Sequence, residues 1–198
     1  MKKQIKARKQ QYGYSIVELL ISLAIISIFS ALAAPRLIGT YRSYQMDDAA
    51  SQVAAQIKFT RYEAIRRNNV TLCLNSAQAA QGGLLTMYTR DIKAPNDNVQ
   101  TNERQIVFAA NALATLAAAA AVPNSGSLAA VVNAGALTTV APANGSITFD
   151  GRGAKTAPAG GSVYWVGNAV YGWRAVTVLP SGSVQVWSTA TGTWRQLS

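Results

Sequence analysis

The chain has 198 residues, of which 49% are hydrophobic, and its 18 basic and 8 acidic residues give a formal net charge of +10. One cysteine and no histidine exclude a disulfide within the chain, a zinc-type ligand cluster and a serine–histidine–aspartate triad. Five of the basic residues lie in residues 1–13, and the remaining 13 against 8 acidic residues leave +5, a balance that does not demand a nucleic-acid partner.

Residues 1–13 form a basic head, and an apolar run follows with one acidic residue, Glu18, at its entrance. No charge occurs from Leu19 to Pro35, and with residues 14–18 the run approaches the roughly 20 residues that cross a bilayer as a helix. A carboxylate at a membrane centre costs about 2.5–3.5 kcal/mol, and less near the end of a span. Glu18 therefore predicts a function and needs a partner. Cleavage after Gly13 would give Tyr14 a new α-ammonium that could meet Glu18 of a neighbouring subunit.

The same residues also fit an ordinary secretory signal. The basic head would be its first region, Leu19–Ser30 has the length of its apolar core, and Ala31-Leu32-Ala33 is similar to an A-x-A cleavage site. A soluble exported domain cleaved after Ala33 is the alternative. Against it, Glu18 interrupts the start of the apolar core, and the helical pattern continues past Ala33.

Residues 14–69 are predicted to form one long helix, with residues 14–36 as its membrane and assembly part and residues 37–69 as an amphipathic part. Pro35 removes a backbone donor and is expected to bend the helix. In the second part, apolar residues recur every three or four positions and predict one buried stripe, made of Ala50, Val53, Ala54, Ile57, Ala64 and Ile65. A helix of roughly 84 Å at 1.5 Å per residue extends far beyond a bilayer and predicts a spine.

Residues 70–198 predict a globular β head. Its first β-like runs are Val70–Leu74, Leu84–Arg90 and Gln105–Phe108, and the polar residues 91–104 predict a loop. The alanine-rich residues 109–145 predict either a short helix around Ala109–Ala121 or a low-complexity surface insertion, without an assignable function. Cys73 is interpreted as a small buried hydrophobe rather than a reactive thiol, with an intermolecular bridge as the alternative.

The C-terminal residues predict an antiparallel sheet with tight turns. Gly167-Asn168 predicts a hairpin turn between the strands Val163–Val166 and Ala169–Val178, and Leu179–Gly182 suits a type I turn before Val184–Trp187. Gly153-Ala154-Lys155-Thr156 ends like a phosphate loop but lacks its earlier glycine, so it predicts a hairpin loop. All four tryptophans lie in this part and are predicted to be core and cross-strand pairs of a sheet packed on the helix stripe.

The N-terminal pattern resembles the class III signal of type IV prepilins and type II secretion pseudopilins. A basic leader ends in Gly13, the aromatic Tyr14 stands where these proteins usually have Phe, and Glu18 is the fifth residue after the cleavage point. Pro35 stands where pilin helices often carry a proline. Phe59–Cys73 is similar to the "A-R-x-E-A-I-x-R-x-x-x-V-x-L-C" region of the FimT/FimU and GspH minor pilins. The resemblance covers most of the chain except residues 75–145.

The resemblance implies a fold and a set of sites. The fold is of the α+β class, in which a long N-terminal transmembrane helix forms a spine packed against an antiparallel β-sheet head. A prepilin peptidase cleaves between Gly13 and Tyr14, and Tyr14 is then N-methylated. Glu18 and Pro35 serve assembly. The chain is a substrate of the peptidase and not an enzyme, and no cofactor or metal is expected.

The resemblance also implies partners and a location. The partners are other pilins through the N-terminal helix, the peptidase and the inner-membrane assembly platform, and the role is a minor pilin that primes or caps a type IV pilus at its tip. A GspH-type pseudopilin of type II secretion and a DNA-binding tip subunit are the alternatives. The candidate DNA contacts are Arg152, Lys155, Arg174 and Arg195. The implied location is the bacterial inner membrane, as a single pass, before the chain enters a pilus or pseudopilus. The positive-inside rule keeps the basic head of the chain in the cytoplasm, so the β head is expected in the periplasm.

Overall fold

A computed structural model describes residues 15–78, 84–91, 104–108, 115–133, 135–190 and 192–197. The predicted leader, including Gly13, lies outside these residues, as do Tyr14, most of the predicted loop at 91–104 and residues 109–114. The chain divides into two compact units, residues 1–40 and 41–198. Helix α1 runs from Ile16 to Arg67 and belongs to both.

The first unit contains the N-terminal part of α1, which continues through Pro35 without ending there. The helix ends in the second unit at Asn68, whose φ of 45° lies in the left-handed region. The Asn69 amide donates to the Ala64 carbonyl at 3.1 Å and the Asn68 amide donates to the Ile65 carbonyl at 3.1 Å. This bonding pattern is a Schellman motif, and it ends the helix close to the predicted Asn69.

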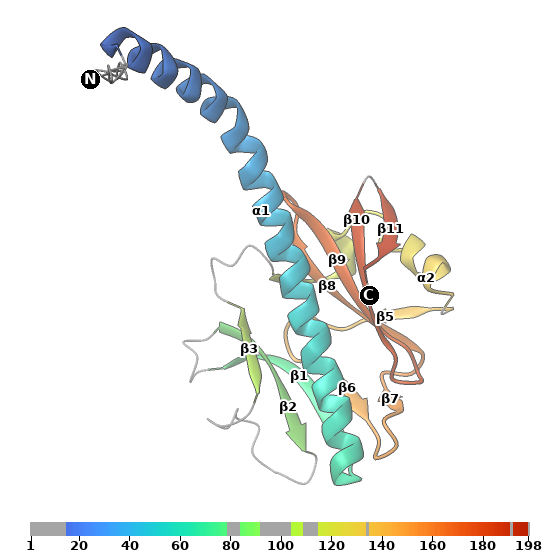
Figure 1. The fold of residues 1–198 in the computed structure, drawn as a ribbon. Coiled ribbons are helices and arrows are strands. Elements are labelled where there is room, and N and C mark those ends of the chain that lie inside the picture. The colour runs from blue at the N-terminus through green and yellow to red at the C-terminus, as the bar shows by residue number, and fades with distance from the viewer. Residues whose placement is uncertain are drawn as a thin grey trace, which may run out of the picture. The chain divides into compact units, whose positions relative to one another are not determined.

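The second unit contains the C-terminal part of α1, two β-sheets and two short helices (Figure 1). The first sheet has the order β3-β2-β1-β6-β7, with β1 at Thr71–Gln78, β2 at Leu84–Asp91, β3 at Gln105–Phe108, β6 at Gly145–Phe149 and β7 at Lys155–Ala157. The second has the order β11-β10-β9-β8-β4, with β4 at Thr115–Ala117, β8 at Gly161–Asn168, β9 at Gly172–Val178, β10 at Val184–Ala190 and β11 at Thr193–Gln196. Neighbouring strands in both orders are antiparallel, and β5 at Leu137–Thr139 pairs parallel with β8. The predicted α+β class, with a helix packed against antiparallel sheets, is confirmed.

The predicted helix stripe forms the centre of the first core. Ala50, Val53, Ala54, Ile57 and Ala64 are buried there together with Met46, against residues of both sheets that include Cys73, Met87, Phe149 and Val176. The prediction is wrong for Ile65, which is 46% exposed. Ile65 lies beside the loop at Gly153 at the edge of the helix contact. Cys73 is fully buried, as predicted, and burial raises the pKa of its thiol to about 12.

The tryptophans belong to a second core. Trp165, Trp173, Trp187 and Trp194 cluster with Val122, Leu128, Val163 and Ala175. Because successive residues of a strand point to opposite faces, Tyr164 and Val166 of β8 join the first core while Val163 and Trp165 join the second. The tryptophans are buried as predicted. The prediction that they pack on the helix stripe is wrong, because they lie on the opposite face of the second sheet.

The alanine-rich segment covers this tryptophan face. Residues 115–121 form β4 and the 3-10 helix η2 at Ala119–Ala121, so the predicted helix around Ala109–Ala121 is wrong for these residues. The α-helix of this segment is α2, at Ser127–Val132. Leu116, Val122, Leu128 and Val140 are buried. The described part of the segment is therefore more than a surface insertion, because Val122 and Leu128 are buried in the second core and Leu116 and Val140 in the first.

The predicted turn at Leu179–Gly182 stands where expected, and the loop predicted at Gly153–Thr156 is correct for Gly153 and Ala154 but wrong for Lys155 and Thr156, which lie in β7. The Gly182 amide donates to the Leu179 carbonyl at 2.8 Å, which closes the predicted turn between β9 and β10. Asp150 accepts hydrogen bonds from the amides of Arg152 and Ala154, in a hairpin loop between β6 and β7. The turn predicted at Gly167-Asn168 is wrong. Both residues lie in β8, and the chain turns at 169–171 because the Asn168 side chain accepts the amides that follow it.

Candidate functional site

The N-terminal part of α1 is an apolar helix without a cover from the described residues. Every residue from 15 to 40 is exposed. In the described part of the chain, α1 is the one helix long and apolar enough to span a membrane, with a mean hydropathy of 2.5 in its most apolar window and none of that window buried. Its large exposed apolar side chains are Ile16, Val17, Leu19, Leu20, Ile21, Leu23, Ile25, Ile26, Ile28, Phe29, Leu32, Leu37 and Ile38. An apolar helix with no polar face requires lipid or other helices around it.

Glu18 lies in the first turn of this helix and is the one acidic residue of residues 15–40. The Ser15 carbonyl accepts from the Leu19 amide at 3.2 Å, and the Ser22 hydroxyl donates to the Glu18 carbonyl at 2.8 Å. Among the described residues, no hydrogen bond or ion pair reaches the Glu18 carboxylate. A negative charge in the first turn is favourable to the helix dipole, but such a carboxylate in an apolar segment still requires a partner from outside it.

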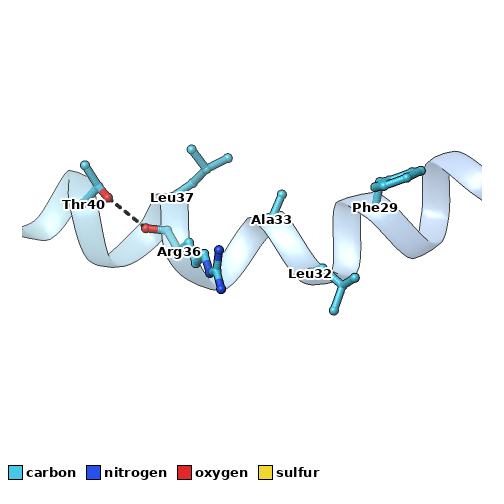
Figure 2. A pocket seen from close by; sticks show the side chains of 6 residues that line it. All are labelled: Phe29, Leu32, Ala33, Arg36, Leu37 and Thr40. Atoms are coloured by element: carbon cyan, nitrogen blue, oxygen red, sulfur yellow. Dashed lines mark hydrogen bonds between the residues drawn. The ribbon is translucent and has the colours of Figure 1, made fainter.

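A shallow groove of about 540 Å³ lies along the same helix (Figure 2). Phe29, Ala33 and Leu37 recur at four-residue intervals and point to one side, and the small Ala33 leaves a gap between the two larger side chains. Leu32, Arg36 and Thr40 complete its lining, and the Thr40 hydroxyl donates to the Arg36 carbonyl at 3.0 Å. The groove is therefore mainly apolar and suited to a side chain from another helix.

The four basic residues predicted as nucleic-acid contacts do not share one exposed surface. Arg152 and Arg195 are exposed, whereas Lys155 and Arg174 are buried. The Lys155 ammonium donates to the Ser162 hydroxyl at 3.0 Å and to the Pro158 carbonyl, and burial lowers its pKa. The prediction of a four-residue patch is wrong for Lys155 and Arg174, because both side chains are buried and already bound to other groups of the protein.

Arg174 binds helix α1 at the start of the second unit. It is 4% exposed, pairs with the Asp47 carboxylate and donates to the Ser43 hydroxyl at 3.0 Å. We call this contact the Arg174 tie. It joins β9 to the helix across 127 positions of sequence, so neighbouring residues in the sequence contained no signal for it.

Arg61 makes a second connection, which we call the Arg61 tie. Its Nε donates to the Gly153 carbonyl at 2.9 Å and its Nη2 donates to the Ser181 carbonyl at 3.3 Å. One side chain thus holds the β6–β7 loop of the first sheet and the β9–β10 turn of the second. Sequence reasoning missed this role, although Arg61 follows Ile57 by four residues and precedes Ala64 by three, at the edge of the buried stripe.

Further polar groups fix α1 against the first sheet. Gln56 donates to Thr89 Oγ1 and to the Arg104 carbonyl, both at 3.0 Å, and the hydroxyls of Thr60 and Thr89 are 2.7 Å apart. Near the helix end, hydrogen bonds from Arg66 and then from Arg67 hold the pKa of the Glu63 carboxyl below its usual value. The contacts of Gln56 and Thr60 thus join α1 to the first sheet, and those of Glu63 lie within the last turns of α1. Among the described residues, no group of three His, Cys, Asp or Glu side chains could hold a metal ion.

Comparisons with known proteins give the family. A family model described as "Prokaryotic N-terminal methylation motif" matches residues 8–34, and one described as "Type II transport protein GspH" matches residues 49–182. A curated relative, type II secretion system protein H of Xanthomonas campestris pv. campestris, is 36% identical over 58 residues. That match covers 29% of this chain and 34% of the relative, so the chain spans about a third of the relative's length.

Among solved structures, the comparison matches the crystal structure of the type IV minor pilin FimU of Pseudomonas aeruginosa (strain PAO1). It shares 13% sequence identity and a TM-score of 0.47, over 77% of this chain and 93% of that chain. The family rests on the sequence matches, which agree with the resemblance to prepilins and GspH proteins. Because the GspH model covers well over half of the chain, the chain belongs to the type II transport protein GspH family of pilin-like structural subunits, which are not enzymes.

Proposed function

We propose that the chain is a minor pilin-like subunit that is inserted in the bacterial inner membrane and then enters a type IV pilus, where it primes or caps assembly at the tip. A prepilin peptidase cleaves between Gly13 and Tyr14 and the new N-terminus of Tyr14 is methylated. Residues 14–36 anchor the subunit as a single pass with its head in the periplasm. Other pilins and the inner-membrane assembly platform are its partners through the helix.

The observation that carries this proposal is the uncovered apolar helix. None of residues 15–40 is buried by the described part of the chain, and burying apolar surface is worth about 25 cal/mol per Å². A lipid bilayer meets that requirement before assembly and neighbouring helices meet it afterwards. The groove at Ala33 offers such a helix a place for one side chain, and Pro35 next to it leaves a backbone carbonyl without its usual donor.

Glu18 supplies the polar part of the same proposal. Its carboxylate lies four residues beyond Tyr14, whose α-ammonium becomes available after cleavage. A charge pair between Glu18 of one subunit and the Tyr14 amine of the next would neutralise both groups in an apolar setting. Loss of one partner from a buried pair costs about 3–5 kcal/mol, so the pair would favour correctly placed subunits strongly.

The first test is Glu18→Ala. We expect normal cleavage, with an N-terminus at Tyr14 and the mass of one added methyl, but at least about tenfold less assembled subunit, since each 1.4 kcal/mol is a factor of ten. The measurement is the intact mass of the purified protein and its abundance in sheared pili. Asp48→Ala is the matched control, because Asp48 is an exposed acid farther along the same helix. Unchanged assembly in Glu18→Ala would contradict the role, and an N-terminus at Ala34 would contradict the anchor.

A pseudopilin of type II secretion is the second candidate. The description of the matching family and the name of the curated relative favour it. Both candidates use the same helix in the same way, so the helix does not separate them. Deletion of the gene separates them: loss of pili with normal export of secreted enzymes supports the pilus, and the reverse supports type II secretion.

A further inference from the structure

We propose that the β8–β9 turn, residues 169–171, contacts the lipid bilayer interface while the subunit is still in the membrane. The inference rests on the proposed function in one respect, that residues 14–36 span the membrane. It adds a second membrane contact, made by the head. The argument uses the exposure of one side chain, its place in the head and the residues at the same end.

Val170 is the most exposed large apolar side chain of the described residues. It is 79% exposed, slightly more than Ile16 at the start of the apolar helix. Its backbone is held in place: the Asn168 carboxamide oxygen accepts the Val170 amide at 3.0 Å and the Tyr171 amide at 2.8 Å, and Gly172 follows with a φ of +90°. The turn therefore presents this valine outward in a fixed geometry.

A single exposed apolar residue needs no special explanation, so its place in the head decides the argument. The Arg174 tie joins the first part of β9 to Ser43 and Asp47. The Arg61 tie joins the turn after β9 to Arg61, which follows Asp47 by 14 residues along α1. Those 14 residues span roughly 21 Å of helix, and the seven residues of β9 span about 20 Å. Strand and helix therefore run side by side in the same direction. The β8–β9 turn lies at the end of the head where α1 enters.

Two exposed tyrosines mark the same end. Tyr41 is 62% exposed and Tyr44 is 68% exposed, and Tyr41 follows the exposed Ile38, which lies just after the anchor, by three positions. Tyrosines concentrate at the membrane–water interface, where their rings meet both apolar and polar surroundings. A pocket of about 220 Å³ opens beside the turn, with Ala169, Trp173 and Pro123 in its wall. Apolar and aromatic side chains therefore lie at this end of the second unit beside polar ones.

The bilayer interface is the occupant that these observations favour over a second protein. Tyr41 follows the proposed anchor, residues 14–36, by five positions, so chain connectivity keeps this end of the second unit nearer to the bilayer than its other end. A partner subunit would have to be recruited, whereas the lipid surface is already present. The β9–β10 turn, at the opposite end of β9, offers the internal comparison.

The test places one fluorescent thiol label on each of three variants of the full chain in nanodiscs of phosphatidylethanolamine and phosphatidylglycerol. The variants are Val170→Cys in the turn, Ser181→Cys at the opposite end of β9, and Leu20→Cys in the anchor. The native Cys73 is fully buried, so it does not compete for the label. Lipids with nitroxide headgroups or nitroxide-labelled chains serve as quenchers.

We expect the label at position 170 to show blue-shifted emission and several-fold stronger nitroxide quenching than the label at position 181, with the label at position 20 quenched as well. If position 20 is quenched and position 170 behaves like position 181, the head contact is overturned while the anchor stands. If none is quenched, the anchor and the proposed function both fail. A blue shift at position 170 without nitroxide quenching would mean that the label lies against protein, and it would overturn the lipid assignment.

Discussion

Arg174 shows how one buried charge can fix a sheet to a helix. Its side chain is almost fully buried in β9, a mostly apolar strand, and a charged residue occupies such a position only when it is paired. The Asp47 carboxylate and the Ser43 hydroxyl supply that pairing. The pair fixes the position of β9 along the axis of α1, because apolar contacts alone would oppose a shift of the strand along the helix less strongly.

Arg174→Ala is expected to lower the free energy of unfolding by about 2 kcal/mol, since it leaves the Asp47 carboxylate, whose side chain is 35% exposed, without its charged partner. The measurement is urea unfolding of the full chain in detergent, followed by far-ultraviolet circular dichroism. The Asp47→Ala/Arg174→Ala double variant should lose less than the sum of the single variants. Strict additivity would show that the two side chains do not interact.

The sequence could not reveal this residue's role. Arg174 and Lys155 were candidate nucleic-acid contacts because they are basic residues in a chain that resembles pilins, and charge alone does not show whether a side chain is exposed. Their burial depends on partners from other elements: Asp47 and Ser43 for Arg174, and Ser162 for Lys155. By contrast, the burial of Cys73 was predictable, because its local apolar run requires no distant partner.

At the scale of elements, the two turns held by Arg61 lie so close together that one of them requires glycine. Gly182 has a φ of +79°, and a Cβ there would overlap the Gly153 carbonyl and lie 2.6 Å from Arg61 Nε. The close approach allows the guanidinium to reach both loops. The glycine and the arginine therefore form a unit that joins the two sheets at one end.

Gly182→Ala is expected to destabilise the chain by about 2–4 kcal/mol, through a strained backbone and a displaced Arg61 side chain. The urea midpoint measures it. Gly126→Ala is the matched control, because Gly126 has a φ of −66° and nothing lies within 4 Å of the added carbon, so its effect should stay within about 0.5 kcal/mol. Equal effects of the two substitutions would contradict the close approach.

Most helices and strands could be predicted from the sequence. Which face of each strand packs against α1 could not. The spacing of Ala50, Val53 and Ile57 predicts a helix stripe because a period of 3.6 residues is a local property. Alternation in β8 likewise predicts a strand. It does not say which face meets α1, and the choice of the wrong face placed the tryptophans on the helix. The alanine-rich segment has weak periodicity, so its role as the cover of Trp165 and Trp194 appears only in three dimensions.

At the scale of the whole molecule, the two units have opposite solvent requirements. The first has no buried residue among those described, and every buried residue of the described chain belongs to the second. The second unit has both cores and both ties. Its stability should therefore be independent of the apolar helix.

A fragment of residues 41–198 is expected to be soluble without detergent, monomeric and folded, with a urea midpoint equal to that of the full chain in mild detergent. Circular dichroism and sedimentation measure this. The reason is that Met46 is the first residue of either core. A fragment with exposed apolar surface and no cooperative unfolding would contradict it, and would mean that residues before Tyr41 belong to the folding unit.

The two ties also determine how the head would respond to tension. A force along the axis of α1 acts on the sheets through the Arg174 tie, through the Arg61 tie and through the apolar contacts between them. Because helix and strand run side by side, these contacts bear the force together, as in shear, and do not open one after another, as in peeling. The rate of forced unfolding depends on the barrier to unfolding and not on the equilibrium free energy. A subunit of this architecture therefore has mechanical strength in one particular direction, the axis of its own helix.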